Sequence, residues 1–445
     1  MSLKSDIKLQ VRDPFFLLPA FVYIGVAGQL SGLILVGIIW AYFHTKESQN
    51  TTISKHVFFL GLTFIGSWLL FPLSDLINSL WGGPDTLRIH LAGSEQPFIV
   101  YKSQLPSSWL VTGIALICIS LRNRSTKIND PSKTIRTFEN SFYNGLIIFS
   151  VLFCVYFVTQ YITGFDYRRP DLNLGPANQL NNGLYRVFGL YGHTLSFSSV
   201  GLAMGTFFAA MHTREQRSKT LKYKFFFLAI LHYFFVFIGG GRVSSIIAGL
   251  VSIAWLIYSF RHKIKMKYIL VNASILSIVL GLLFYGSGIF SRLLLMLEKG
   301  ADGQIGINFP RMVFWKVHWN MFLDSPLIGH GAGRLREFVL TAYYQISGFG
   351  SYFRQYNAHN IYLETLANIG LIGFFSLLAL LALGWNYLKQ LSSRVFSSDI
   401  RACFIMAVLA NAMHGLTQNV FFDANVMSVY LVLFWFVFWV HIVEE

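Results

Sequence analysis

Residues 219–265 read KTLKYKFFFLAILHYFFVFIGGGRVSSIIAGLVSIAWLIYSFRHKIK. Two apolar runs, 225–239 and 243–260, flank the break Gly239-Gly240-Gly241-Arg242. Basic residues crowd both outer ends of this segment, and Arg242 is the one basic residue between them. Apolar helices cross a bilayer, and short loops rich in Lys and Arg stay in the cytoplasm. The segment therefore predicts a pair of membrane helices whose glycine-rich turn faces the outer side.

Composition extends this prediction to the whole chain. Hydrophobic residues make up 54% of the 445 residues, and charged residues only 12%, against about 25% in soluble domains. At roughly 20 apolar residues per span, this allows about a dozen membrane helices. The composition excludes a soluble enzyme, a disordered chain and a fibrous repeat. We predict an all-α polytopic membrane protein that forms one integral membrane domain over residues 1–445.

Apolar runs and basic loops together predict twelve spans. The runs that could cross a bilayer are 56–80, 106–121, 141–163, 186–211, 225–239, 243–260, 268–289, 361–388, 402–422 and 425–441. The first run, 14–44, fits one long helix or two short ones. Loops 122–140, 212–224 and 261–267 are basic and predicted cytoplasmic. Counting membrane crossings back from loop 122–140 favours two helices in 14–44, because an even number there places the basic N-terminus in the cytoplasm. Both termini are then cytoplasmic.

The net charge of +15 suits this membrane topology, so we expect no nucleic-acid partner. Most basic residues fall in the predicted cytoplasmic segments, but thirteen do not, and ten of those are arginines. Any one of these thirteen residues, taken alone, can equally be a solvated charge in a loop with no functional role. Arg242, at the glycine break, and Arg186, at a predicted helix start, stand out because an arginine at the membrane edge is costly unless it meets an anion. The planar guanidinium group of arginine can donate two parallel hydrogen bonds to a phosphate group.

Three long loops, 81–105, 164–185 and 290–360, are predicted on the outer side. The last contains aromatic residues at helical spacing, so we expect short amphipathic helices at the membrane surface there. These residues are Phe314, Trp315, Trp319 and Phe322. The sequence contains no Asp-x-Asp, Asp-x-Glu or Glu-x-Asp pair, no HExxH and no phosphate-binding loop. The cysteines show no metal-binding spacing. We expect no metal and no cofactor.

Three motifs follow one another in the second half of the chain. Residues 308–315 read NFPRMVFW, residues 326–333 read PLIGHGAG, and residues 358–373 read AHNIYLETLANIGLIG. This order resembles the signature of the O-antigen ligase and O-antigen polymerase superfamily of bacterial polysaccharide enzymes. Upstream, the segments GGGRVSS at 239–245 and RVFGLYGH at 186–193 are similar to further arginine-containing segments of that family.

The resemblance implies twelve spans in the bacterial inner membrane and an active site at the periplasmic face, formed in part by loop 290–360. It implies a metal-independent glycosyltransferase that moves a glycan from undecaprenyl diphosphate to a sugar hydroxyl. The expected partners are the lipid-linked donor glycan, an acceptor glycan, the lipid bilayer and a chain-length regulator.

Roles for individual residues follow from this chemistry. We predict His359 as the general base, and Arg311 and Arg242 as catalytic arginines that approach each other and stabilise the diphosphate. The predicted substrate-binding residues are Arg186, His193, Asn360 and Arg334. A lone histidine is more often a packing or capping residue. The functional roles predicted for His359 and His193 therefore rest on the motifs that contain them. We expect His318 and His330 in loops, and no direct hydrogen bond from Glu364 to His359.

The molecule that accepts the transferred glycan is not determined by the motifs, so two types of enzyme stay open. A polymerase would use a second lipid-linked repeat unit, whereas a ligase would use lipid A-core. Ligases often carry a second histidine two residues before the motif histidine, and this chain has Asn357 there, which favours a polymerase. A flippase for lipid-linked oligosaccharides should show charge deep in its helices and internal repeats, which this sequence does not.

The topology leads to the first testable prediction. A cysteine placed at Lys219 should resist a membrane-impermeant thiol reagent in intact spheroplasts and react after permeabilisation, because loop 212–224 is cytoplasmic. A cysteine at Asp302, in the predicted periplasmic loop, is the matched control and should react in intact spheroplasts. Labelling of the Lys219 position without permeabilisation would overturn the assignment.

Overall fold

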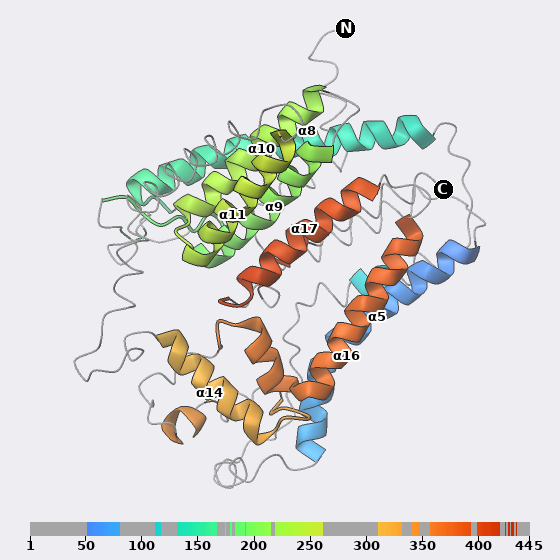
Figure 1. Ribbon diagram of the computed structural model, residues 1–445, viewed down its shortest axis with the longest axis vertical. Coiled ribbons are helices and arrows are strands. Elements are labelled where there is room, and N and C mark those ends of the chain that lie inside the picture. The colour runs from blue at the N-terminus through green and yellow to red at the C-terminus, as the bar shows by residue number, and fades with distance from the viewer. Residues whose placement is uncertain are drawn as a thin grey trace.

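The computed structural model describes residues 51–80, 112–116, 131–166, 174, 179, 183–191, 193–214, 219–260, 310–331, 340, 342–346, 357–392, 398–418, 423, 426, 427, 429, 430 and 433. Within them the chain is helical, and an isolated bridge joins Gln179 to Tyr185. The helices are α5 (Thr51–Leu80), α8 (Pro131–Thr163), α9 (Thr194–Arg214), α10 (Lys219–Ile238), α11 (Arg242–Phe260), α14 (Pro310–Asp324), α16 (Ile361–Ser392) and α17 (Ser398–His414) (Figure 1).

Five helices of the described part, namely α8, α9, α10, α11 and α16, are long and apolar enough to cross a membrane. This confirms the multi-pass membrane class for the chain. Several predicted spans, including 14–44 and 268–289, lie outside the described residues, and so does most of 106–121. The count of twelve therefore stays a prediction, as do the two outer loops 81–105 and 164–185.

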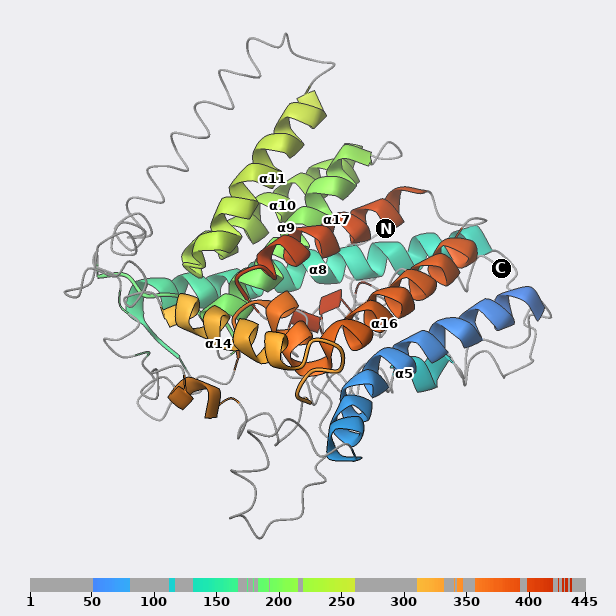
Figure 2. The same ribbon diagram turned by 60° about the horizontal axis from the view of Figure 1, so that its bottom comes forward.

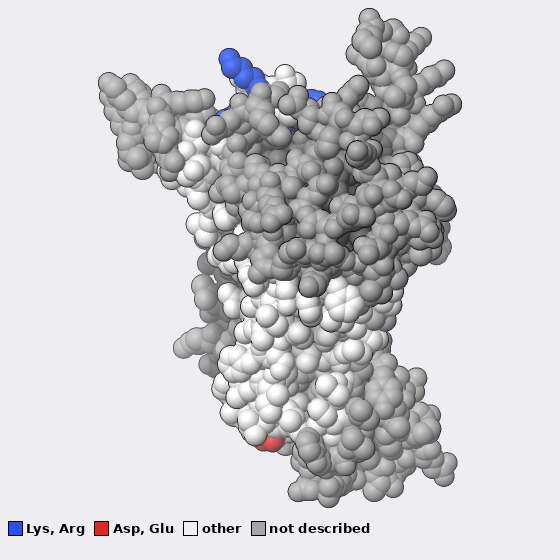
Figure 3. Space-filling model, turned by 90° about the vertical axis from the view of Figure 1, so that its right-hand side faces the viewer, with Lys and Arg blue, Asp and Glu red and all other residues white. Residues whose placement is uncertain are grey.

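The predicted pair of helices around the glycine break is confirmed. Helix α10 ends at Ile238 and α11 begins at Arg242. Between them Gly240 has a φ of +65°, which favours glycine because a Cβ would crowd the backbone. The basic residues Lys219 and Lys222 begin α10 and lie at the opposite end of this helix. In the view of Figure 3 the described surface shows Lys and Arg at one end, Asp and Glu at the other and an uncharged middle.

Helix α9 is the centre of the larger helical group, because α10, α11 and α17 all pack against it. Nearly the whole of its apolar stretch is buried. Phe157 of α8 packs edge-on against Phe197 of α9 and Phe235 of α10, at 4.8 and 5.1 Å between ring centroids. Such edge-to-face pairs add stability beyond the apolar area that they bury.

A second group consists of α5, α14 and α16. Helices α5 and α16 lie side by side in both ribbon views (Figures 1 and 2). The predicted helix within loop 290–360 is confirmed as α14, whose buried face packs with Tyr344 and Ala367. Its placement at a membrane surface is not tested by the structure.

Helix α16 is interrupted at Gly370, and the turn after α14 fills the interruption. Gly370 has a φ of +63° and a ψ of −170°, so the helical hydrogen bonds across it are lost. The freed carbonyls of Ala367 and Asn368 accept hydrogen bonds from the backbone N–H groups of His330 and Gly331, at 3.0 and 2.8 Å. A buried unpaired backbone group is costly, so this exchange fastens the turn to the helix.

The residues of α16 that follow the interruption also form hydrogen bonds with this turn. The N–H groups of Leu371 and Ile372 donate to the carbonyls of Pro326 and Leu327, at 2.8 and 3.0 Å. The hydroxyl of Ser74 in α5 donates to the Asn368 carbonyl at 3.1 Å. Turn 326–331 is thus hydrogen-bonded to α16 on both sides of Gly370. It connects α14 to α16, and the Ser74 hydroxyl connects α5 to the same place.

The starts of α9 and α8 differ from the predicted boundaries. The helix predicted for 186–211 begins at Thr194, because Phe188 and Gly189 donate their N–H groups to the side-chain oxygen of Gln160 at 2.8 and 2.9 Å. Gly189 has a φ of +56°, which also favours a turn. Arg186 therefore does not start a helix. The predicted loop 122–140 is too long, because α8 already begins at Pro131, and proline is well suited to a first helical position.

The interruption of α16 leads to the second prediction. Gly370→Ala should lower the free energy of unfolding by at least about 2 kcal/mol, because a Cβ there would overlap the Leu327 carbonyl and the φ is left-handed. Gly66→Ala in α5 is the matched control, since its Cβ would meet only the Leu380 side chain at 3.5 Å. Thermal unfolding of the detergent-purified proteins measures both. Equal stability of the two variants would contradict the interlocking of turn and helix.

Candidate functional site

The predicted site residues gather where several helices end. The start of α16, the first turn of α14 and the end of α17 approach one another, as Figures 1 and 2 show. The segment that precedes α9 belongs to the same place, because His193 interacts electrostatically with Arg311 of α14. Helix ends are suited to a polar site, since their terminal backbone groups lack partners within the helix.

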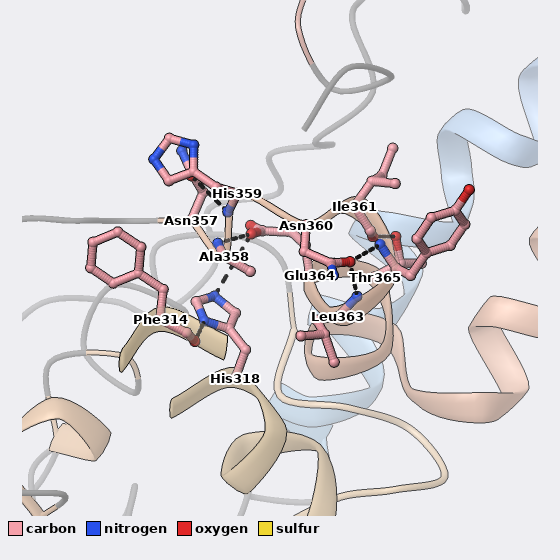
Figure 4. Close-up of polar contacts among 11 residues, drawn as sticks. Phe314, His318, Asn357, Ala358, His359, Asn360, Ile361, Leu363, Glu364 and Thr365 are labelled. Atoms are coloured by element: carbon pink, nitrogen blue, oxygen red, sulfur yellow. Dashed lines mark hydrogen bonds and ion pairs between the residues drawn. The ribbon is translucent and has the colours of Figure 1, made fainter. Parts of the chain in front are cut away.

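His359 stands in a strained turn just before α16. It is the one non-glycine residue of the described part with a positive φ, +48°. Such strain persists only where the surroundings fix it. Here the side-chain oxygen of Asn357 accepts a hydrogen bond from the His359 N–H at 3.2 Å, and a carboxylate oxygen of Glu364 accepts one from the Ala358 N–H at 2.6 Å (Figure 4). The backbone around His359 is therefore held on both sides.

Asn360 caps α16. Its side-chain oxygen accepts hydrogen bonds from the N–H groups of Tyr362 and Leu363, at 3.0 and 3.1 Å (Figure 4). These donors have no partner within the helix, and asparagine is among the best residues at this position. The observed contacts of Asn360 thus hold the helix start, and a substrate contact for it stays a prediction.

The side chain of His359 has four identified neighbours. Its Nδ1 lies 2.9 Å from the amide oxygen of Gln418, at the end of α17. Its ring lies 5.9 Å from that of Phe314, centroid to centroid. Burial is the largest cause that lowers the pKa of His359, and the charges of Arg311 and His193 lower it further, while the hydrogen bond to Gln418 acts in the opposite direction. The imidazole is therefore neutral near pH 7.

Arg311 is the charge at the centre of the cluster. It occupies the first turn of α14 and interacts electrostatically with three histidines, His193, His359 and His414. Burial lowers the pKa of its guanidinium, which stays charged at neutral pH because its ordinary pKa exceeds 12. Arg311 is thus a partly buried cation among three histidines.

His193 and Arg186 lie on the side of α9. The side chain of His193 is exposed at the surface of the site, and partial loss of water around it is the main cause that lowers its pKa. Asp423 opposes this shift, whereas Arg186 and Arg311 add to it. Arg186 donates to the hydroxyl of Thr194 at 2.9 Å. Its side chain also borders Gly240, where a Cβ would come within 3.3 Å of the Arg186 Nε.

The cluster therefore contains most of the residues predicted from the sequence. Arg311, His193 and His359 interact electrostatically, and Arg186 acts in the same way on His193 while its side chain borders the glycine turn that precedes Arg242. Arg242 is the first residue of α11, and its approach to Arg311 stays a prediction. Arg334 lies outside the described residues.

The prediction that His318 lies in a loop was wrong, because His318 lies within α14. His330 lies in turn 326–331, as predicted, and both side chains are fully buried. The Nδ1 of His318 lies 2.8 Å from the Phe314 carbonyl and its Nε2 lies 3.7 Å from Glu364, while the Nε2 of His330 lies 2.7 Å from the Met321 carbonyl. Both hold the backbone around the site. The prediction that Glu364 does not bond His359 fits the contacts found, since that carboxylate serves Ala358 and His318.

Sequence reasoning missed Gln418, Asp423 and His414. Gln418 and His414 fall inside the run 402–422, which was assigned to a span, but α17 ends at His414 and turns. The available signal was polar side chains within an apolar run, which in membrane proteins usually mark a functional site. Asp423 carries a hydrogen bond from the Ser196 hydroxyl of α9. In the described part, no group of three His, Cys, Asp or Glu residues could hold a metal ion.

Part of the chain matches a known protein family. Residues 225–378 match the family described as O-antigen ligase. The matched stretch extends from α10 into α16 and includes Arg242, Arg311 and His359. The resemblance seen in the sequence motifs is thereby confirmed for this part of the chain. No curated protein matches the chain.

Proposed function

From the O-antigen ligase match at 225–378, we propose that this membrane protein is a glycosyltransferase that moves a glycan from undecaprenyl diphosphate to a sugar hydroxyl. The observation that carries the proposal is the electrostatic interaction of Arg311 in α14 with His359 before α16, two residues of the matched stretch that are far apart in the sequence. One supplies a fixed positive charge and the other a neutral imidazole. Transfer from a diphosphate to a hydroxyl needs both.

The donor would bind through its diphosphate. As the bond between the sugar carbon and the phosphate oxygen breaks, negative charge grows on the leaving diphosphate. Arginine forks fixed in advance stabilise that charge in the transition state. Arg311 takes this role, Arg186 binds at the His193 side, and Arg242 at the glycine turn completes the site. Arg334 would contact the substrate from loop 290–360.

The acceptor hydroxyl would lose its proton to His359. The hydroxyl oxygen forms a bond to the sugar carbon of the donor, its proton passes to the imidazole, and the electron pair of the broken bond leaves with the diphosphate. The imidazole gives the proton to solvent when the products depart. This step needs a neutral histidine, and the lowered pKa of His359 provides one near pH 7. No metal and no cofactor take part in the proposed reaction.

The site would face the periplasm from the bacterial inner membrane. His193, the glycine turn and Arg242 lie at the ends of α9, α10 and α11 that are opposite to Lys219 and Lys222. If those lysines face the cytoplasm, as the basic loops indicate, the cluster faces the other side. That is where a lipid-linked donor and its acceptor would meet.

The acceptor remains the point on which two candidates differ. We favour a polymerase that joins lipid-linked repeat units, because Asn357 replaces the second histidine that ligases often carry. In the structure Asn357 supports the His359 turn through its hydrogen bond to the backbone. The family description, O-antigen ligase, favours transfer to lipid A-core instead. A chain-length regulator would be an additional partner of the polymerase.

The proposed roles of His359 as the base and Arg311 as the diphosphate ligand predict different effects of substitution. His359→Ala should lower transfer by about 100-fold or more, within the range of general-base catalysis, while binding of the lipid-linked donor is unchanged. Arg311→Lys should lower both transfer and donor binding, because a point charge cannot reproduce the fork. Purified enzyme with purified donor, assayed for transfer and for binding, makes the comparison.

Lys316→Ala is the control for lost charge, since Lys316 is exposed on the same helix as Arg311. It should retain both transfer and binding. If His359→Ala keeps more than about a tenth of the wild-type rate, its loss is below the general-base range and His359 is a packing residue. Full activity of Arg311→Lys would remove the phosphate role from Arg311.

The acceptor is decided by the surface polysaccharide of a deletion strain. Loss of a polymerase should leave core capped with a single repeat unit, because transfer to core still operates. Loss of a ligase should leave bare core, with long polymer still attached to undecaprenyl diphosphate. Gel separation of lipopolysaccharide, together with analysis of lipid-linked glycans, distinguishes the two. An unchanged profile would contradict both candidates.

A further inference from the structure

We propose that Gln418 is a positioning residue for His359, which orients the imidazole and fixes the proton on its Nδ1. The inference deepens the proposed function and rests on it, because it assigns a partner to the base of the transfer reaction. Gln418 lies 59 positions after His359 in the sequence and outside the matched stretch 225–378. Only the folded chain brings the two together.

The hydrogen bond has one chemically sensible direction. The amide oxygen of Gln418 lies 2.9 Å from Nδ1 of His359. An amide oxygen only accepts hydrogen bonds, so Nδ1 must carry the proton and donate it. In the neutral imidazole the other nitrogen, Nε2, then holds a lone pair. The proton acceptor of the ring is thereby assigned to Nε2.

Gln418 itself is held in place by the turn that follows α17. The side chain is 8% exposed. In the same turn, the carbonyl of Gly415 accepts a hydrogen bond from the Ile361 N–H at 2.9 Å. One turn of α17 earlier, the Ala412 carbonyl accepts one from the Tyr362 hydroxyl at 2.8 Å. The end of α17 is thus fastened to the start of α16, next to the base that it orients.

The bond also balances the charges around His359. Arg311 from α14 and His193 from the segment before α9 both lower the pKa of the ring, and burial lowers it most. Glu364 of α16 is engaged by the Ala358 N–H and lies near His318, and Asp423 acts on His193. The acceptor oxygen of Gln418 opposes the lowering, because it stabilises the protonated ring. The hydrogen bond to Gln418 thereby offsets part of the lowering of the His359 pKa.

Without Gln418 the proton of the neutral ring is free to move to Nε2. That form cannot accept a proton from the acceptor hydroxyl at the same nitrogen. Removing the hydrogen-bond partner of a metal-bound histidine typically lowers metal affinity or activity by about 10- to 100-fold, and we expect a loss of the same order for the partner of this base. The effect should fall on kcat rather than on the KM for the donor, because the donor is held by arginines.

Two substitutions at Gln418 should move the titration of His359 in opposite directions. Gln418→Glu places a carboxylate against Nδ1, so the NMR titration midpoint of His359, assigned by its absence in His359→Gln, should rise. The acid limb of the pH–rate profile should rise with it, with transfer retained at pH about 8. Gln418→Leu removes the acceptor, so the midpoint should fall and kcat should drop about 10- to 100-fold.

Tyr362→Phe is the matched control, because it removes a side-chain bond between α16 and α17 without touching the imidazole. It should lower thermal stability and leave the His359 midpoint and the acid limb unchanged. An unchanged midpoint in both Gln418 variants, or a shift in Tyr362→Phe of the same size, would overturn the proposal. A shifted midpoint with an active His359→Ala would support the bond to Gln418 and overturn only the base role.

Discussion

The four backbone hydrogen bonds that join turn 326–331 to the interrupted helix α16 constrain the rest of the site. The break in α16 frees two carbonyls and two N–H groups, and a buried backbone group without a partner is costly. Here Ala367, Asn368, Leu371 and Ile372 find those partners in one short turn. Because α14 leads directly into that turn, its orientation relative to α16 is fixed.

This constraint has a direct chemical consequence. Arg311 starts α14 and His359 precedes α16, so both lie at one end of the elements that the turn clamps together. Their relative position depends on backbone hydrogen bonds rather than on flexible side chains. A site built in this way needs little reorganisation when charge develops, which is the general condition for electrostatic catalysis.

Several polar side chains of the site are held by local hydrogen bonds. Asn360 caps one helix, Glu364 supports the turn that strains His359, and Ser196 contacts Asp423 beside His193. Buried polar groups are tolerated when they are fully engaged. His318 and His330 are also buried, and one ring nitrogen of each lies within hydrogen-bond distance of a backbone carbonyl.

The sequence alone determined the membrane class, the paired helices around Gly239–Arg242, the helix within 290–360 and the motif residues Arg311 and His359, because hydrophobic length, glycine breaks and short motifs are local properties. Only the tertiary structure decided where α9 begins, since Gln160 captures the backbone at 188–189 from another helix. It also decided that Gln418 meets His359 and that His193 meets Arg311. Those contacts join segments far apart in the chain, and their partners are chosen by helix packing, which no local pattern encodes.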